Sequence, residues 1–422
     1  MISIFLKNNE ITERIKCGVC EVLGLGISNL PLCRWLRKKG ATVVGRDMKP
    51  LENIEGADEL ISLGVKIVSG EGYLDGIGGN HPERTVIFRA PGIRPDAEGI
   101  RSAVERGALL TSEMELFLEL TPAKVFGITG SDGKTTTTTL VGLILSEQAR
   151  LDNSNRRVYV GGNIGRPLLP LVDEMTENDL CVVELSSFQL MTAKRSTDRA
   201  LITNITENHL NWHHGMSEYE QAKKNIFAHE PCERVALNFE NECTAQFGKT
   251  ANIKVDFFSS KRTLENGAFI LDGAIVCADE KGIERIIGLD EIVLPGVHNI
   301  ENYMAAILIT RGYASAEAVR RVASSFTGVE HRCELFAEKD GVKFYNSSID
   351  STPTRTAAAL SNFKVKPIVI CGGRDKNTDF APLAVTLCEK ARAVVLTGEA
   401  AEKIKSALLS YDKLEKSGLV II

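Results

Sequence analysis

The sequence lacks long hydrophobic runs and an excess of charge of one sign. No stretch approaches the roughly 18 consecutive apolar residues that a membrane-spanning helix requires. Residues 1–16 lack the basic start, apolar centre and small-residue cleavage site of a signal peptide. The 50 Lys and Arg residues nearly balance the 55 Asp and Glu residues, which argues against a protein that coats nucleic acid. We therefore expect a cytoplasmic protein without membrane insertion and without a nucleic-acid partner.

A disulfide or metal framework of cysteines is also lacking. The 10 cysteines are scattered, and most lie in apolar runs, which is typical of reduced, buried thiols. Cys17 and Cys20 match C-x-x-C, but we expect both in a first strand, where residues three apart point to opposite faces. No second Cys or His pair follows at zinc spacing, so we expect neither a zinc site nor a redox role here.

The length of 422 residues is sufficient for several domains. Short apolar runs alternate with helix-like stretches in three successive parts of the chain, which indicates mainly parallel sheets covered by helices. We expect an α/β protein with domains at 1–120, 121–327 and 328–422. Asn-Gly and Asp-Gly turns at 266–267 and 272–273 predict a small antiparallel patch in the middle domain.

The sharpest motif is a glycine-rich turn between an apolar strand and a helix. It reads Gly127-Ile-Thr-Gly130-Ser-Asp-Gly133-Lys134-Thr135. Such a loop lets backbone N–H groups approach phosphate oxygens at a helix N-terminus. Lys134 would reach the β- and γ-phosphates, and the Thr135 hydroxyl would bind Mg²⁺. The first glycine stands one residue earlier than in G-x-x-x-x-G-K-[ST].

Two further candidates follow apolar strands of the middle domain. Glu184 ends one such strand and could bind Mg²⁺ beside the phosphate loop, or could be a solvated strand end. His209 lies at the end of another strand, where ligands gather in open α/β sheets, although an isolated histidine is more often structural. His213 and His214 are expected to be loop residues.

Polar residues on two predicted helices leave their roles open. Lys223 and Lys224 follow Tyr219 on one helix, and composition alone predicts a solvated face. Asn299 and Asn302 are three apart near the start of another helix and share a face. They either cap that helix or bind a polar ring such as adenine.

A second glycine turn lies near the N-terminus. Gly24-Leu-Gly26-Ile-Ser-Asn29 is close to G-x-G-x-x-G, with Asn29 in place of the third glycine. Asp47 ends the next strand, near the place of a ribose-binding acid. The turn around Pro91 and Gly92 follows a further strand. This pattern fits a nucleotide-diphosphate site better than a standard NAD fold.

Taken together, these motifs resemble the Mur ligases of bacterial cell-wall synthesis over nearly the whole chain. The motifs that carry the resemblance include Gly161-Gly-Asn-Ile-Gly-Arg-Pro-Leu168, Glu184-Leu-Ser-Ser-Phe-Gln-Leu190, Asn204–His209, Tyr219–Lys223, His298–Asn302, Glu330-His-Arg332 and Ser351-Thr-Pro-Thr-Arg-Thr356. The motifs at 184–190 and 161–168 resemble those of the member that adds D-glutamate. The resemblance implies an ATP-dependent ligase that joins D-glutamate to UDP-N-acetylmuramoyl-L-alanine through an acyl phosphate. It also implies Rossmann-like outer domains and a central P-loop ATPase-type domain.

The resemblance further implies a role for each matching residue. ATP would be held by Gly130, Ser131, Asp132, Gly133, Lys134, Thr135, Thr136, Asn299, Asn302 and Arg332. The UDP-linked substrate would meet Gly26, Ile27, Ser28, Asp47, Pro91, Gly92 and Asn163, and D-glutamate would meet Ser351 and Lys376. Two Mg²⁺ sites are implied, one with Thr135 and Glu184 and one with His209 and a carbamylated Lys223, for which Lys224 is the alternative. Lys134, His209 and Lys223 are the implied catalytic residues.

The chain departs from the family at two places. Ser347 stands where the family usually has Asp, and Asp350 is a partial substitute. The chain also stops before a Ser-rich motif that closes over D-glutamate in the family. These departures leave a second interpretation, a nucleotide-binding relative with weak turnover. A ligase for another amino acid, folylpolyglutamate synthase and a NAD-dependent oxidoreductase are further alternatives, and we expect a monomer.

Overall fold

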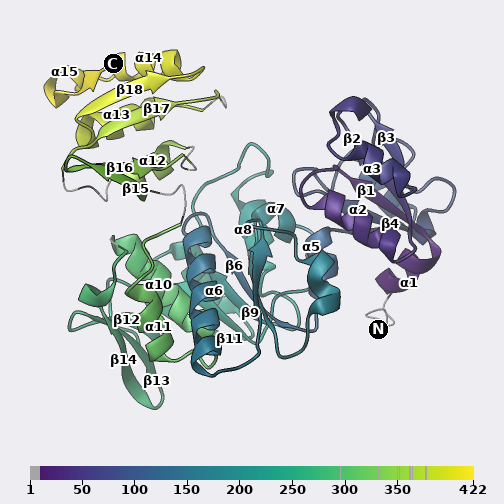
Figure 1. Ribbon diagram of the computed structural model, residues 1–422, viewed down its shortest axis with the longest axis horizontal. Helices are drawn as coiled ribbons and strands as arrows, with labels where there is room; N and C mark the ends of the chain where they lie inside the picture. The colour runs from purple at the N-terminus through teal and green to yellow at the C-terminus, as the bar shows by residue number, and fades with distance from the viewer. Residues whose placement is uncertain are drawn as a thin grey trace. The chain divides into compact units, whose positions relative to one another are not determined.

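The computed structural model describes residues 10–294, 296–329, 333–348, 350, 352–360, 363, 365–375 and 378–422. The chain forms two compact units, one comprising Met1–Ile292 with Val297–Ser324 and the other comprising Val293–Gly296 with Ser325–Ile422. The first unit contains two separate sheets, and the second contains two smaller ones (Figure 1). The three-domain division expected from the sequence remains a prediction. None of the helices described is long and apolar enough to cross a membrane.

The N-terminal sheet is parallel, with strand order β3-β2-β1-β4-β5. Its strands are β1 (Val19–Leu23), β2 (Thr42–Asp47), β3 (Lys66–Ser69), β4 (Thr85–Arg89) and β5 (Leu109–Thr111). The helices around it are α1 (Glu10–Cys17), α2 (Asn29–Lys38), α3 (Ala57–Ser62) and α4 (Glu98–Glu105). Successive strand residues point to opposite faces, so Val22 packs in the core that contains α2, while Leu23 packs with Ile100 of α4. Both faces of the sheet are therefore covered.

The C-x-x-C pair differs from its expected placement. Cys17 is the last residue of α1, and only Cys20 lies in a strand. The helix forms because Ile11 and Ile15, four residues apart, share one helical face and are buried in the core. Gly18 then allows a tight approach, because a Cβ there would lie 1.8 Å from the carbonyl oxygen of Arg84.

The central sheet has nine strands in the order β14-β13-β12-β11-β10-β9-β6-β8-β7. Its strands are β6 (Lys124–Thr129), β7 (Val158–Gly162), β8 (Leu180–Glu184), β9 (Arg199–Ile202), β10 (Arg234–Asn238), β11 (Lys254–Ser259), β12 (Gly267–Leu271), β13 (Ala274–Asp279) and β14 (Gly282–Gly288). In the order of the sheet, all neighbouring strands from β7 through β8, β6, β9, β10 and β11 to β12 pair in parallel. The strands β12, β13 and β14 pair antiparallel. The mainly parallel sheet and its antiparallel patch are thus as expected.

Helices cover both faces of the central sheet (Figure 1). The helices of this part are α5 (Glu113–Leu120), α6 (Lys134–Leu151), α7 (Ser187–Leu190), α8 (Met216–Lys224), α9 (Glu242–Thr250), α10 (Val297–Thr310) and α11 (Ala316–Ala323). On one face α6 packs against α10, α11, β7 and β8. On the other, side chains of β6, β8, β9 and β10 join α5 and α8 in a core that continues into the N-terminal sheet. The two sheets of this unit therefore share apolar packing.

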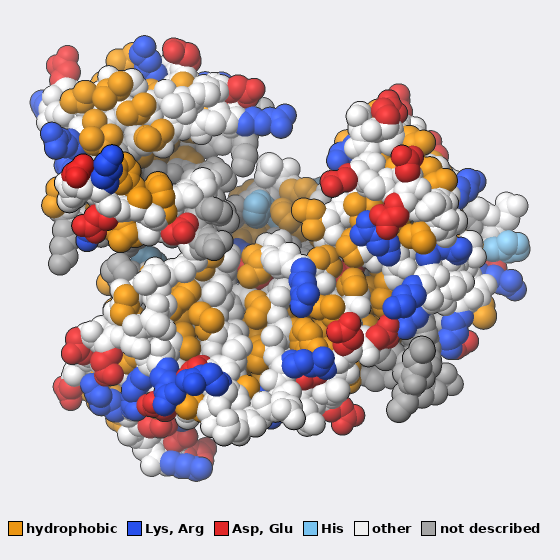
Figure 2. All heavy atoms as spheres, viewed as in Figure 1, with side chains coloured by type: hydrophobic (Ala, Val, Ile, Leu, Met, Phe, Trp, Pro, Cys, Tyr) orange, Lys and Arg blue, Asp and Glu red, His pale blue; other side chains and the backbone are white. Residues whose placement is uncertain are grey.

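The second unit is built on two small sheets. An antiparallel pair, β15 (Glu334–Lys339) and β16 (Val342–Asn346), precedes the parallel strands β17 (Ile368–Gly372), β18 (Ala393–Thr397) and β19 (Val420–Ile421). Its helices are α12 (Pro353–Leu360), α13 (Ala381–Lys390), α14 (Ala401–Leu409) and α15 (Leu414–Ser417). Leu387 and Val394 lie at the centre of its core. Several apolar side chains of this unit, such as Ile368 and Ile370, are exposed, and Figure 2 shows apolar side chains at its surface.

Candidate functional site

The glycine-rich loop 127–135 connects β6 to α6, as the sequence predicts. Gly133 precedes the helix with φ +80°, a left-handed conformation that favours glycine. A Cβ at this position would lie 2.5 Å from Oδ1 of Asn302. At Gly130 a Cβ would lie 1.9 Å from Oγ1 of Thr203. The loop is therefore packed so closely against its neighbours that both positions require glycine.

The segment after β9 holds this loop in place. The backbone N–H of Ser131 donates to Asn204 O at 2.9 Å, and that of Asp132 donates to Asn204 Oδ1 at 2.9 Å. Ser131 Oγ donates to the carbonyl of Thr206 at 3.0 Å and accepts from its N–H at 2.9 Å. Tyr219 OH lies 2.9 Å from the same hydroxyl. A fixed loop backbone of this kind is pre-organised for an anionic ligand.

Lys134 begins α6 and folds back over the loop. Its Nζ donates to the carbonyl oxygens of Gly130 and Ser131, both at 2.9 Å. Thr135 and Thr136 follow in the first helical turn, where backbone N–H groups lack intrahelical acceptors. The helix N-terminus and the ammonium group together make this region electropositive.

Glu184 ends β8, the strand next to β6, and its carboxylate is buried. Oε1 accepts a hydrogen bond from Asn163 Nδ2 at 2.8 Å, and the two backbones are joined by Asn163 N–H donating to Glu184 O at 2.8 Å. Oε2 is buried and accepts no hydrogen bond. A buried acceptor without a partner is costly. An Mg²⁺ ion, which prefers carboxylate oxygens, would satisfy this atom.

Lys223 is buried beneath the phosphate loop, on the inner face of α8. Its Nζ donates to Gly130 O at 2.7 Å and to Thr129 Oγ1 at 3.4 Å. Burial, followed by the nearby charge of Lys134, holds the pKa of Lys223 well below its usual value. The neighbouring Lys224 points elsewhere, with its Nζ 5.6 Å from the ring centroid of Phe247. Only Lys223 of the pair approaches the phosphate loop.

The two histidines after β9 have different environments. His209 is exposed, has φ +56°, and its ring centroid lies 4.9 Å from that of Phe188. His213 lies in a loop, as expected, but is buried, with Nε2 2.9 Å from Ser187 Oγ and Nδ1 3.1 Å from Glu218 Oε2. Burial lowers the pKa of His213. Neither periodicity nor a local motif in the sequence signals this burial.

Asn299 and Asn302 lie in the first turns of α10, and their side chains interact. Asn302 Nδ2 donates to Asn299 Oδ1 at 3.2 Å, while Asn302 Oδ1 accepts from Thr137 Oγ1 at 3.1 Å. Because Asn302 also lies next to Gly133, the pair borders the phosphate loop. The structure thereby brings together the predicted residues of loop 130–136, Asn163, Glu184, Lys223, Asn299 and Asn302.

The predicted UDP-site residues gather at the carboxyl edge of the N-terminal sheet. Asp47, at the end of β2, accepts hydrogen bonds from the N–H groups of Leu25 at 2.7 Å and Lys49 at 2.9 Å. Its carboxylate therefore holds the glycine turn that contains Gly26, Ile27 and Ser28. Ile27 is 82% exposed. Pro91 and Gly92 follow β4, which pairs with β1, so they lie at the same edge.

Three predicted residues, Arg332, Ser351 and Lys376, lie outside the described residues. Ser347 is described: its hydroxyl accepts from Cys333 N–H at 3.0 Å and donates to Asp350 Oδ2 at 2.7 Å. The residue that replaces the family's Asp is therefore directly linked to the acid considered as its substitute.

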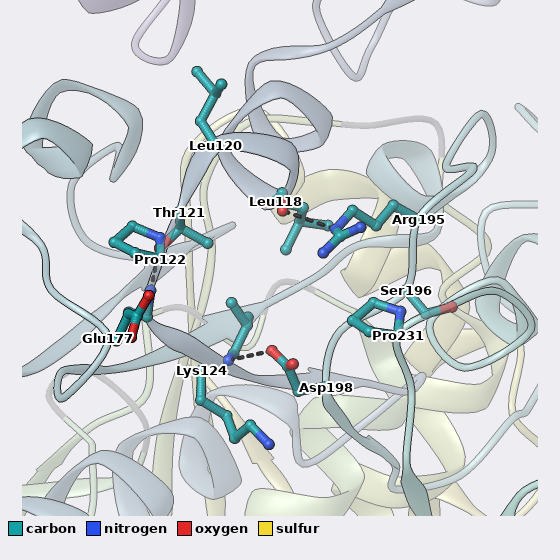
Figure 3. A pocket seen from close by; sticks show the side chains of 12 residues that line it. Leu118, Leu120, Thr121, Pro122, Lys124, Glu177, Arg195, Ser196, Asp198 and Pro231 are labelled. Atoms are coloured by element: carbon teal, nitrogen blue, oxygen red, sulfur yellow. Dashed lines mark hydrogen bonds between the residues drawn. The ribbon is translucent and has the colours of Figure 1, made fainter. Parts of the chain in front are cut away.

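Two further observations concern possible metal ligands and cavities. Within the described part of the chain, no three His, Cys, Asp or Glu side chains cluster as a preassembled metal centre. Mg²⁺ beside a nucleotide needs only one or two protein carboxylates, so this observation is compatible with the Glu184 site. A cavity of about 420 Å³, lined by Thr121, Lys124, Arg195 and Asp198, lies at the start of β6 (Figure 3). It is at the opposite end of that strand from the phosphate loop.

The amino-acid sequence of this chain is similar to those of known proteins. Residues 128–310 match the Mur ligase middle domain. A UDP-N-acetylmuramoylalanine–D-glutamate ligase from Ruminiclostridium cellulolyticum is 46% identical over 407 residues, which cover 96% of this chain and 85% of the relative. The corresponding enzyme from Clostridium perfringens is 44% identical over 410 residues, covering 97% and 86%.

Solved structures share the fold at low sequence identity. A UDP-N-acetylmuramate–alanine ligase from Thermotoga maritima is 20% identical, with a TM-score of 0.58 over 96% of this chain and 90% of that chain. A pseudomurein peptide ligase type C from Methanothermus fervidus is 16% identical, with a TM-score of 0.54 over 96% and 88%. These likenesses support the multi-domain α/β architecture expected from the sequence.

Proposed function

The chain belongs to the Mur ligase family, and from this premise we propose that it joins D-glutamate to UDP-N-acetylmuramoyl-L-alanine with cleavage of ATP to ADP and phosphate. The relatives named for this reaction match almost the whole chain. The structural observation that carries the proposal is the pairing of a glycine-rich phosphate loop with the buried, unpartnered Oε2 of Glu184 on the adjacent strand. Together they provide an anion site with a cation ligand beside it.

The reaction requires two successive displacements. A carboxylate oxygen of the alanyl group attacks the γ-phosphorus of ATP, the bond to the β-phosphate oxygen breaks, and ADP leaves. The amine of D-glutamate then attacks the carbonyl carbon of the acyl phosphate and loses a proton. The tetrahedral intermediate collapses with release of inorganic phosphate and formation of an amide. Both steps depend on alignment and on stabilisation of negative charge rather than on a covalent protein group.

The phosphate loop and α10 are proposed to bind ATP. Loop N–H groups and the N-terminus of α6 would hold the phosphates, and Lys134, by exchanging its bonds to loop carbonyls, would hold the γ-phosphate. Asn299 and Asn302 would hydrogen-bond to the adenine ring, since Asn302 lies against Gly133, the two side chains are bonded to each other, and both carry amide groups. Arg332 is proposed to contact ATP from its match to the family motif alone.

We propose Glu184 and Thr135 as ligands of one Mg²⁺, and His209 and Lys223 as ligands of a second. Bound Mg²⁺ neutralises phosphate charge and orients the γ-phosphoryl group for in-line transfer. The unpartnered Oε2 of Glu184 fits a cation. His209, whose ring centroid lies 4.9 Å from that of Phe188, would supply an imidazole nitrogen to the second ion.

Lys223 can serve as a ligand only after it loses its positive charge. Its lowered pKa favours a neutral amine, which adds to CO₂ to give a carbamate and release a proton. The carbamate supplies anionic oxygens of the kind that Mg²⁺ accepts. The burial of Lys223 beside Gly130, compared with the position of Lys224 over Phe247, supports Lys223 as the modified residue.

The carboxyl edge of the N-terminal sheet is proposed to bind the UDP group. Asp47 and the turn of Gly26, Ile27 and Ser28 would contact the nucleoside, where the exposed Ile27 offers an apolar surface to a flat base. Pro91 and Gly92 would contact the diphosphate or sugar, and Asn163, held by Glu184, the muramoyl group. Ser351 and Lys376 are proposed to bind the D-glutamate carboxylates. Since ATP and a UDP-linked precursor are the substrates, we propose a cytoplasmic location, and a monomer remains our prediction.

Phosphate release with UDP-N-acetylmuramoyl-L-alanine and a series of amino acids tests this function. We expect release to require D-glutamate and to be negligible with L-lysine, glycine or D-alanyl-D-alanine. Release that is equally fast with another amino acid would overturn the assignment of the acceptor. The control omits the UDP-linked substrate and measures unproductive ATP hydrolysis.

Binding of nucleotide with little turnover is a second candidate. The observation in its favour is Ser347, which is engaged with Asp350 where the family usually has an acid. Calorimetric ATP binding without D-glutamate-dependent phosphate release would support this candidate. Restoration of turnover by Ser347→Asp would locate the cause.

A further inference from the structure

Arg94 connects two segments that are far apart in the sequence. It lies in the loop after β4, close behind Pro91 and Gly92. Its Nη2 donates to Glu218 Oε1 at 3.0 Å and its Nη1 to Glu218 Oε2 at 3.3 Å. Nη1 also donates to the carbonyl oxygen of Trp212. One guanidinium group therefore holds a helix and the loop that precedes it.

Trp212 reinforces the contact between the loop after β4 and the loop after β9. Its indole Nε1–H donates to Gly92 O at 3.1 Å, so a proposed substrate-site residue is bonded directly to the loop that contains His209. The guanidinium carbon of Arg94 lies 4.8 Å from the Trp212 ring centroid, within the range of a cation–π interaction. The two segments are 118 and 120 residues apart at these contacts. We call Arg94, Trp212 and Glu218 the clamp.

Glu218 is the acidic residue of the clamp and lies across from the loop that follows β4. It lies in the first turn of α8, the helix that carries Lys223. Besides Arg94, Oε2 accepts from the N–H of His214 at 2.9 Å and lies 3.1 Å from His213 Nδ1. The hydrogen bonds from Arg94, followed by those from His214 and His213, lower the pKa of Glu218 to about 2. The carboxylate thus remains ionised and fully engaged at neutral pH.

The clamp extends through His213 to the strand end that carries Glu184. His213 Nε2 lies 2.9 Å from Ser187 Oγ, and the His213 ring stacks on Phe188 with an interplanar angle of 10° and a centroid distance of 5.5 Å. Phe188 also contacts Trp212, with ring centroids 4.5 Å apart. A single set of contacts therefore joins the proposed substrate turn to the segments that carry all the proposed metal ligands except Thr135.

We propose that Arg94 is a positioning residue that aligns the bound UDP-linked substrate with the γ-phosphate, by fixing the Pro91–Gly92 turn to α8 and to the His209 loop. This inference rests on the proposed function. In-line attack requires reacting atoms about 3–3.5 Å apart, and a displacement of about 1 Å can reduce the rate by about 10²-fold. Neither segment can achieve this alignment alone, because they belong to different sheets.

Arg94 is also the member of this region that can be changed with least risk to folding. Arg89, which likewise holds this turn by donating to Pro91 O and Ile93 O, is 1% exposed, so its removal would leave several buried carbonyls without donors. The Arg94 side chain is 20% exposed, and water can solvate the groups that it leaves. Arg150 provides a matched control. It forms a bidentate pair with Glu147, at 2.8 and 2.6 Å, near the end of α6 remote from the phosphate loop.

The test measures D-glutamate-dependent phosphate release by the full chain while each substrate is varied. We expect Arg94→Ala to lower kcat by about 10–10²-fold and to raise KM for the UDP-linked substrate by about 10-fold, with KM for ATP within about twofold. Arg94→Lys should recover only part of kcat, since one ammonium cannot replace a bidentate fork and ring contact. Arg150→Ala should match the wild type, and melting temperatures should show that Arg94→Ala is folded.

A double variant separates positioning from general destabilisation. Glu218→Gln should reproduce the kinetic pattern of Arg94→Ala, and combining the two should add little, because both disrupt the same Arg94–Glu218 ion pair. Kinetics of Arg94→Ala equal to those of Arg150→Ala would overturn the inference. So would a parallel rise of both KM values, or effects of the two clamp substitutions that multiply. A wild-type protein without D-glutamate-dependent release would instead contradict the proposed function itself.

Discussion

The substitution Lys223→Met addresses the most consequential residue of the proposed site. It removes the amine and keeps a flexible apolar chain of similar length. The wild-type Nζ donates to Gly130 O and Thr129 Oγ1. Gly130 O keeps a donor in the variant, since Lys134 Nζ also bonds to it at 2.9 Å. The lost hydrogen bonding should cost about 1 kcal/mol, and it is offset because an amine no longer has to be buried.

Activity should respond far more than stability. The variant cannot form a carbamate, and we expect kcat to fall by about 10²–10³-fold, the range found when one preorganised electrostatic group is removed from a site. ATP affinity should change little, because the loop N–H groups and Lys134 remain. Short-chain carboxylic acids should restore part of kcat, since they can supply the missing anionic oxygens. Phosphate release measures kcat, and calorimetry measures the affinity for ATP.

Lys224→Met is the matched control, since it makes the same chemical change at the next position. Its Nζ lies over the Phe247 ring rather than beside the phosphate loop, so we expect nearly wild-type kinetics. Labelling with ¹³C-bicarbonate should give a carbamate NMR signal in the wild type and in Lys224→Met but not in Lys223→Met. Full activity of Lys223→Met, or loss of the signal only in Lys224→Met, would refute the reasoning.

The burial of Lys223 should also make the stability of the protein depend on pH. Burial lowers the pKa of Lys223 in the folded protein below its unfolded value of about 10.4. Between these two values the unfolded state binds more protons, so the free energy of unfolding contributed by this group rises with pH. In CO₂-free buffer, where Lys223 remains an amine, the advantage of Lys223→Met over the wild type in urea denaturation should therefore be largest at low pH and should shrink as the pH approaches 10. A constant difference would contradict the assigned burial effect.

Three further substitutions test individual contacts of the structure. Gly133→Ala places a Cβ 2.5 Å from Asn302 Oδ1 at φ +80°, a strain of about 1–2 kcal/mol, so calorimetry should show ATP affinity weakened roughly tenfold; unchanged affinity would contradict the close packing. Arg46→Met leaves the buried carboxylate of Glu21 without its 2.6 Å partner, and urea denaturation should show a loss of about 3–5 kcal/mol, whereas a negligible loss would contradict the pairing. Glu184→Gln should raise the Mg²⁺ concentration for half-maximal phosphate release by at least about tenfold, and an unaltered Mg²⁺ titration would remove it as a ligand.

Local sequence determined the elements whose signal is contained in a few neighbouring residues. An apolar strand, the glycine loop and a helix follow one another as the sequence predicted, in β6, residues 127–135 and α6. An apolar run, two glycines and a helix-forming stretch specify this unit without help from the rest of the chain. The mainly parallel sheets follow from the same alternation. The helix α1 was missed, because its apolar signal consists of only Ile11 and Ile15 among charged residues.

Tertiary structure decided which of several equivalent residues lies in the site. Lys223 and Lys224 are equivalent in composition, but successive helical residues differ in direction by about 100°, and only packing determines which one faces the phosphate loop. His213 had no distinguishing signal, and its burial depends on Ser187 and Glu218. The same holds for Asn302, whose place beside Thr137 and Gly133 depends on how α10 packs against α6.

The sequence by itself therefore determined the chemistry that is available: a phosphate loop, a carboxylate at a strand end, and the motifs of a ligase family. The folded chain decided how these groups act together. Glu184 Oε2 is buried without a hydrogen-bond partner where β8 lies beside β6, and Arg94 meets Glu218 across a separation of 124 residues. Such contacts depend on how two sheets pack, and packing is a property of the whole core rather than of any short segment.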